Sequence, residues 1–200
     1  GKGAIVEINA ETDFVARNED FQSFVENVTS LALCGNGTLA DLKATAYAAG
    51  AENVEQTLTN MIATIGENMD LRRIASLEVP SGVVSSYMHN ALKPGLGKIG
   101  VLVALESTGD SEQLNALGKQ LAMHVAAANP QAISRDDVEA DDLEREKTIL
   151  AEQARESGKP DDIIEKMVEG RLRKYYEEVC LLEQTYVIDG DTKVGNVIEA

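Results

Sequence analysis

A glycine cluster between Gly95 and Gly100 carries the letters of a dinucleotide-binding loop, G-x-G-x-x-G. In such a loop a strand comes first and a helix follows, because the helix N-terminus supplies the N–H groups that bind pyrophosphate. Here an apolar stretch typical of a strand, Ile99 to Leu105, follows the glycines instead. No Ser or Thr follows Lys98, so the pattern of a phosphate-binding P-loop fails as well. We expect a flexible entry to a strand, and no cofactor bound to this chain.

The histidines and cysteines are few and scattered. His89 and His124 are the only histidines, and neither has a His or Cys neighbour at metal-ligand spacing. Cys34 and Cys180 lie outside any C-x-x-C pair, so we expect reduced thiols that act as small core residues. The sequence also lacks H-E-x-x-H and G-x-S-x-G motifs. These patterns predict no metal site and disfavour an enzyme.

The segment Glu11–Asn18, here called the Phe14 turn, places an aromatic, a carboxylate and an arginine within five residues. Two interpretations are open. In the first, Thr12 or Asp13 caps a helix and Phe14 makes the first contact of that helix with the core. In the second, a rigid turn presents Phe14 as a hydrophobic wedge beside a charge, which is a common composition of a protein-binding hot spot.

The elements around this turn predict a repeat. A strand at residues 3–11 precedes a helix with apolar residues from Phe14 to Leu31, which Gly35-Asn36-Gly37 ends. The same order returns as a strand at 98–106 and a helix at 112–129. Each half closes with a strand-like stretch, at 74–79 and 179–188. We therefore expect an α+β fold of two pseudo-repeated subdomains, residues 1–94 and 95–200, each a small antiparallel sheet with packed helices.

The second half contains additional helical sequence at 139–179. Apolar residues recur at helical spacing on both sides of Ser157-Gly158-Lys159-Pro160, whose Gly and Pro are typical of a helix end and a helix start. Two amphipathic helices joined by so short a turn form an antiparallel hairpin. The stretch is too polar for a core, so we expect a protruding antiparallel coiled coil inserted in the second subdomain.

Composition limits the partners. Eighteen Lys and Arg against 34 Asp and Glu give a net charge of −16, with 44% hydrophobic residues. A chain this acidic is repelled by phosphate backbones and anionic lipid, so we expect no direct nucleic-acid or membrane binding. The first residues do not form a secretion signal, and the two unpaired cysteines suit a reducing compartment. We expect a cytoplasmic protein.

Several stretches resemble the bacterial elongation factor Ts family. Asn9 to Asn18 (NAETDFVARN) is similar to the family's signature segment. Further similar stretches follow in family order from about residue 4 to residue 198: Ile65–Asn68 with Arg72-Arg73, Lys98–Val103, Ala122–Ala127, Ser157–Pro160 and Lys166–Arg171.

The resemblance implies a guanine-nucleotide exchange factor for the translational GTPase elongation factor Tu, and a core region that lacks the family's N-terminal helical module. It implies that Thr12, Asp13 and Phe14 bind the GTPase, Asp13 near its Mg²⁺ region and Phe14 as a wedge between helices. Ile99, Gly100 and His124 fall at further partner-contacting positions of the family. From the residues alone, His124 is a partly buried helix histidine with a hydrogen bond. The alternative function is a non-catalytic scaffold or interaction protein that forms a homodimer.

Overall fold

The computed structural model describes residues 1–35, 37–47, 50 and 52–200, and the chain forms two compact units, Gly1–Ala126 and Ala127–Ala200. In the described residues, no helix is long and apolar enough to cross a membrane. The α+β class with two small antiparallel sheets is confirmed, and both sheets lie in the first unit.

The first sheet pairs β1 (Lys2–Ala10) with β2 (Met69–Glu78). The strands are antiparallel, from Lys2 opposite Glu78 to Ala10 opposite Met69, with an irregularity between Glu7 and Ile8. These are the strands predicted at 3–11 and 74–79. The pairing puts the end of β1, where the Phe14 turn begins, beside the start of β2.

The second sheet is a hairpin of β3 (Gly82–Lys93) and β4 (Leu96–Glu106). β4 is the predicted strand at 98–106, whereas β3 was not predicted. Gly97 and Gly100 lie inside β4, after the turn at Pro94-Gly95, which confirms the glycine cluster as an entry to a strand. The boundary expected between residues 94 and 95 falls in this turn. The division into subdomains 1–94 and 95–200 stays a prediction.

Among the described residues, four helices connect β1 to β2. They are α1 (Asp13–Ala16), α2 (Glu19–Cys34), α3 (Leu39–Ala44) and α4 (Val54–Ile65). α2 ends at Cys34 with Gly35 as its C-cap, while Asn36 of the predicted stop lies outside the described residues. Cys34 is exposed at this helix end, so the expectation that it acts as a core residue is wrong, whereas Cys180 is buried as expected. The core lies between these helices and the first sheet, and its fully buried members are Phe24, Val28, Val54 and Leu71.

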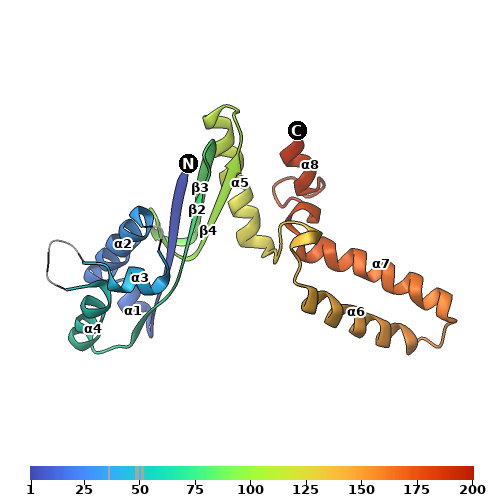
Figure 1. The fold of residues 1–200 in the computed structure, drawn as a ribbon, viewed down its shortest axis with the longest axis horizontal. Helices are drawn as coiled ribbons and strands as arrows, with labels where there is room; N and C mark the ends of the chain where they lie inside the picture. The colour runs from blue at the N-terminus through green and yellow to red at the C-terminus, as the bar shows by residue number, and fades with distance from the viewer. Residues whose placement is uncertain (36, 48–49, 51) are drawn as a thin grey trace. The chain divides into compact units, whose positions relative to one another are not determined.

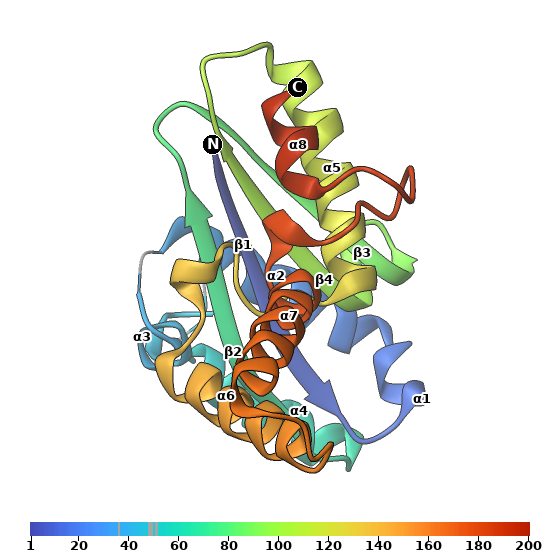
Figure 2. The ribbon, with the colours of Figure 1, turned by 90° about the vertical axis from the view of Figure 1, so that its right-hand side faces the viewer.

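Helix α5 (Ser111–Ala128) follows β4, as the sequence predicts. It packs closely on β3, because a Cβ at Gly118 would collide with the Ser85 side chain. Figures 1 and 2 show α2 and α5 on opposite sides of the strands. The four strands therefore form the middle of the first unit.

The second unit is helical. It contains the short 3₁₀ helices η1 (Arg135–Asp137) and η2 (Leu181–Glu183), and the α-helices α6 (Ala140–Arg155), α7 (Asp161–Val179) and α8 (Val194–Glu199). α6 and α7 run side by side (Figure 1), and Arg171 donates a hydrogen bond to Gln153 across them at 3.1 Å. Their assignment as a protruding coiled coil within 139–179 stays a prediction.

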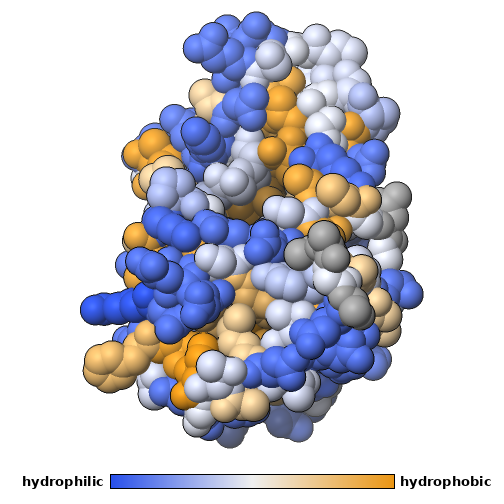
Figure 3. Space-filling view, turned by 90° about the vertical axis from the view of Figure 1, so that its left-hand side faces the viewer, coloured by the Kyte–Doolittle hydropathy of each residue, from blue (hydrophilic) through white to orange (hydrophobic). Residues whose placement is uncertain are grey.

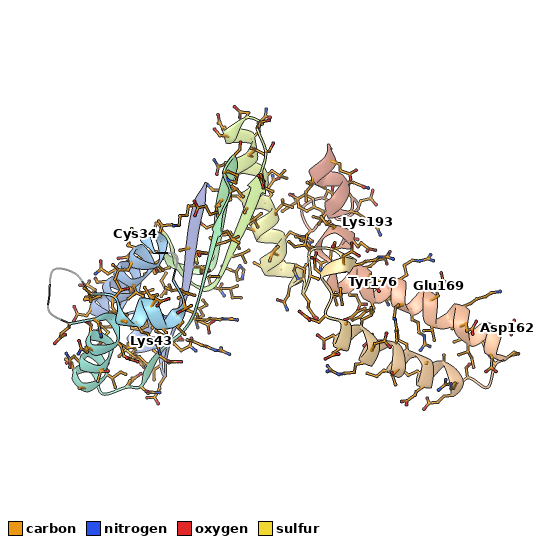
Figure 4. The ribbon with its side chains drawn as sticks, in the orientation of Figure 1. Cys34, Lys43, Asp162, Glu169, Tyr176 and Lys193 are labelled. Atoms are coloured by element: carbon orange, nitrogen blue, oxygen red, sulfur yellow. The ribbon has the colours of Figure 1, made fainter. Side chains whose placement is uncertain are left out.

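The strand expected at 179–188 is wrong. α7 continues to Val179, η2 follows, and isolated single bridges join Cys180 to Ala132 and Thr185 to Lys193. Arg135 fixes this segment: its Nη2 donates to Glu183 Oε2 at 2.7 Å, and its guanidinium lies 4.5 Å from the ring centre of Tyr176. Tyr176 lies near the C-terminal end of α7 (Figure 4). The hydrogen bonds of Arg135 lower the pKa of the Glu183 carboxyl.

Candidate partner-binding site

The Phe14 turn reverses the chain between β1 and α2. β1 ends at Ala10, α1 occupies one helical turn, and Asn18 caps α2 by accepting a hydrogen bond from Phe21 N–H at 3.0 Å. Thr12 occupies the N-cap position of α1, as the first interpretation expects, but its side chain makes no capping hydrogen bond there. The side-chain cap of the long helix α2 is Asn18, because α1 and α2 are separate helices.

Phe14 faces solvent, with 86% of its surface exposed. Its neighbour Val15 is buried in the core, and so are Phe21 and Phe24. The expectation that Phe14 makes the first core contact is thus wrong, since Val15 makes it. An aromatic side chain this exposed leaves its apolar surface available to another molecule.

A second turn supports the Phe14 turn from the side. Thr12 Oγ1 lies 2.9 Å from both carboxylate oxygens of Glu67 and donates its proton to them. Asn68 N–H donates to Glu11 Oε2 at 3.1 Å. We call these contacts the 67–68 brace. They join the end of β1 to the turn that leads from α4 into β2.

The conformation of Gly66 places Glu67. Gly66 ends α4 with a φ of 81°, a left-handed conformation that glycine adopts without steric cost, and its N–H donates to Ile62 O at 2.8 Å. Met69 and Leu71, directly after the brace, are buried in the core. The brace therefore connects the Phe14 turn to a strand whose first residues are buried in the core.

The start of β4 reaches the same turn. Lys98 Nζ lies 3.1 Å from Asp13 Oδ1, and both side chains are well exposed. Ile99, the next residue, is 46% exposed. The structure thus brings Thr12, Asp13 and Phe14 together with the strand that carries Ile99 and Gly100.

Gly100 is a position of close packing between the two sheets. A Cβ there would collide with Ile5 Cδ1 of β1 and come within 3.0 Å of Met88 on β3. The absence of a side chain at Gly100 therefore leaves room for the ends of the Ile5 and Met88 side chains.

His124 lies on α5 and is completely buried. It is more enclosed than the partly buried histidine that the sequence suggests. Its side chain has no surface to offer a partner in this conformation, so the structure does not bring it to the exposed part of the site.

The exposed groups at the site are the Phe14 ring, the Ile99 side chain and the Asp13–Lys98 ion pair, which suit recognition by shape and charge. Within the described residues, no three or more His, Cys, Asp or Glu side chains are arranged to hold a metal ion. Two hollows in the second unit, of about 90 and 160 Å³, are smaller than the roughly 300–1,000 Å³ of small-molecule pockets. Figure 3 shows the face formed by α2, α3 and α4, where apolar side chains alternate with hydrophilic ones.

Residues 11–200 match the family described as Elongation factor TS. The chain belongs to the elongation factor Ts family. Curated relatives named Elongation factor Ts are 62% identical in Rhodospirillum rubrum, 58% in Rhodospirillum centenum and 58% in Paramagnetospirillum magneticum. The alignments cover 98%, 98% and 99% of this chain and 64% of each relative. The resemblance to the elongation factor Ts family stated from the sequence is confirmed.

Sequence reasoning missed two residues of the site, Glu67 and Lys98. Both fall in stretches that resemble the elongation factor Ts family, which is the only signal that could have singled them out. Their partners, Thr12 and Asp13, lie 55 and 85 positions away in the chain. No local pattern of residue types predicts contacts over such distances.

Proposed function

We propose that this chain binds the translational GTPase elongation factor Tu and promotes the release of GDP from it. The observation that carries the proposal is the 86% exposure of Phe14 on a braced turn in a chain of the elongation factor Ts family. The chain spans about 64% of the length of its curated relatives. Whether residues 1–200 by themselves promote nucleotide exchange must therefore be measured on this chain.

The proposed mechanism uses the wedge and the charge of the Phe14 turn. Phe14 inserts between helices of the GTPase domain, and Asp13 acts near the Mg²⁺ region of the GTPase. Mg²⁺ and the phosphate-binding backbone hold GDP, so displacing them weakens nucleotide binding. By linkage, GDP weakens the binding of this chain by the same factor. This chain forms no covalent intermediate and holds no nucleotide or cofactor, and it is not itself an enzyme.

The other proposed contacts differ in how accessible they are. Ile99 is exposed and borders the Asp13–Lys98 ion pair, so it extends the contact surface of Phe14. Gly100 contributes by keeping β4 close to β1. A contact of His124 with the partner requires that the groups packed over its ring move on binding, because the residue is completely buried.

Stopped-flow release of a fluorescent GDP from elongation factor Tu tests the proposal. The samples are this chain, its Asp13→Ala and Phe14→Ala variants, and buffer alone. We expect strong acceleration that falls with either variant. If the unmodified chain neither accelerates release nor binds the nucleotide-free GTPase, the proposal is wrong for this chain.

Sedimentation velocity tests the alternative of a dimerising scaffold. In that case the chain sediments as a dimer, and Phe14→Ala leaves both the dimer and the rate of GDP release unchanged.

A further inference from the structure

The helix that carries Phe14 is too short to be stable by itself. α1 spans only Asp13–Ala16, and a single helical turn costs more conformational entropy than its hydrogen bonds recover. Phe14 is 86% exposed and therefore gains little from packing inside the chain. The burial of Val15 anchors one side of α1, and contacts of the residues before Asp13 hold the turn at its start.

Thr12 and Glu11 make contacts that can do so. The hydroxyl of Thr12 donates a hydrogen bond to the carboxylate of the half-buried Glu67. It makes no capping hydrogen bond at the N-terminus of α1. A hydrogen bond to an ionised carboxylate is stronger than one between neutral groups. The bond from Asn68 N–H to Glu11 Oε2 fixes the adjacent residue, so the turn is held at two consecutive positions.

We propose that Thr12 and Glu67 are positioning residues for Phe14. This inference rests on the proposed function. The resemblance to elongation factor Ts suggests that Thr12 touches the partner, but its hydroxyl is already occupied by Glu67. The two residues act through Phe14: they keep it in the orientation that the partner accepts, and they reduce the ordering cost of binding.

When the brace is removed, fewer molecules hold Phe14 in the orientation that can bind the partner. If Phe14 is correctly placed in only a fraction of the molecules, the apparent dissociation constant rises by the inverse of that fraction. The effect appears only while Phe14 is present to be placed. A direct contact of Thr12 with the partner would instead be independent of Phe14.

The test compares Thr12→Val, which removes the hydroxyl at similar volume, with Thr12→Ser, which keeps it. Glu67→Ala removes the acceptor. The control is Thr59→Val on α4, because the Thr59 hydroxyl is exposed and donates only to Glu55 O of its own helix in the described residues. Binding to nucleotide-free elongation factor Tu is measured by titration calorimetry. Hydrogen exchange at residues 13–17 is measured on the unbound chain.

We expect Thr12→Val and Glu67→Ala to weaken binding about 3- to 10-fold, as one hydrogen bond is lost. Both should accelerate hydrogen exchange at residues 13–17, while Thr12→Ser and Thr59→Val should behave like the unmodified chain. In a Phe14→Ala background, Thr12→Val should cause no further loss, since coupled residues are not additive.

Three results overturn the inference: unchanged binding by Thr12→Val, unchanged exchange at residues 13–17, or a full additional loss in the Phe14→Ala background. Failure of the proposed function looks different. In that case the unmodified chain does not bind, while hydrogen exchange still decides whether Thr12 and Glu67 order the turn.

Discussion

Replacing Phe14 with alanine should leave the fold intact and weaken partner binding. The chain provides its own control in Phe24, which is completely buried in the core of the same unit, whereas Phe14 is 86% exposed. Truncating a buried phenylalanine costs about 3–5 kcal/mol of folding free energy. Exposed substitutions change it by only about 0.5 kcal/mol. Phe24→Ala should therefore shift the urea unfolding midpoint strongly, and Phe14→Ala should not.

The loss in binding can be worked from the same exposure. Burying a whole phenylalanine side chain is worth about 1.5–3 kcal/mol. With 86% of Phe14 available, its burial against a partner contributes about 1.3–2.6 kcal/mol. The dissociation constant for nucleotide-free elongation factor Tu should thus rise roughly 10- to 80-fold in Phe14→Ala.

Urea unfolding followed by circular dichroism and titration calorimetry of binding together decide the matter. A loss of 2 kcal/mol or more of folding free energy in Phe14→Ala would show that Phe14 packs inside the chain, and our reasoning from exposure would be wrong. Unchanged stability together with unchanged binding would place the partner contact elsewhere.

Three further predictions concern packing, charge and thiol accessibility. Gly100→Ala should cost about 1–3 kcal/mol of folding free energy, measured by urea unfolding, because the new methyl group overpacks the space between the two sheets. The hydrogen-bonded arginine holds the pKa of Glu183 below its usual 4.5, so the stability it contributes is present above that value and lost as the pH falls below it. Acid unfolding of Glu183→Gln should accordingly depend less on pH than that of the unmodified chain. The control is Glu169→Gln, at an exposed position along α7 (Figure 4), which should keep the full pH dependence. A thiol reagent should modify Cys34, which is exposed at the end of α2 (Figure 4), in the native chain. It should modify Cys180 only after unfolding, since burial shields Cys180 and raises the pKa of its thiol. Two rapidly reacting thiols in the native chain would contradict this.

The fold was predictable where a periodic pattern coincides with local structure. The strands β1, β2 and β4 and the helices α2, α5, α6 and α7 all follow from the spacing of apolar residues. β3 was missed because its buried positions include Ser85, so its alternation of apolar and polar residues is weak. The stretch 179–188 is rich in residues that favour strands, but helical continuation to Val179 and the contacts of Glu183 override that preference.

The site was predictable in its residue types but not in its geometry. A Thr-Asp-Phe sequence after a strand fits a capped helix with a core aromatic as well as an exposed wedge. Only the tertiary structure decides between them, because Val15 takes the core position and leaves Phe14 outside. The contacts of Glu67 and Lys98 depend on how the second turn and the second hairpin pack, which no local pattern contains.

The long sequence separation of the contacts around Phe14 has a consequence for biosynthesis. The contact of Thr12 with Glu67 cannot form until Glu67, 55 positions later, has been synthesised. The contact of Asp13 with Lys98 requires a residue 85 positions later. At 5–20 residues per second, Lys98 is added roughly 4–17 s after Asp13. During that interval a nascent chain carries the Phe14 turn without all of its supports. A short peptide that contains Thr12 to Phe14 lacks the same contacts, so it should bind the partner more weakly than the finished chain.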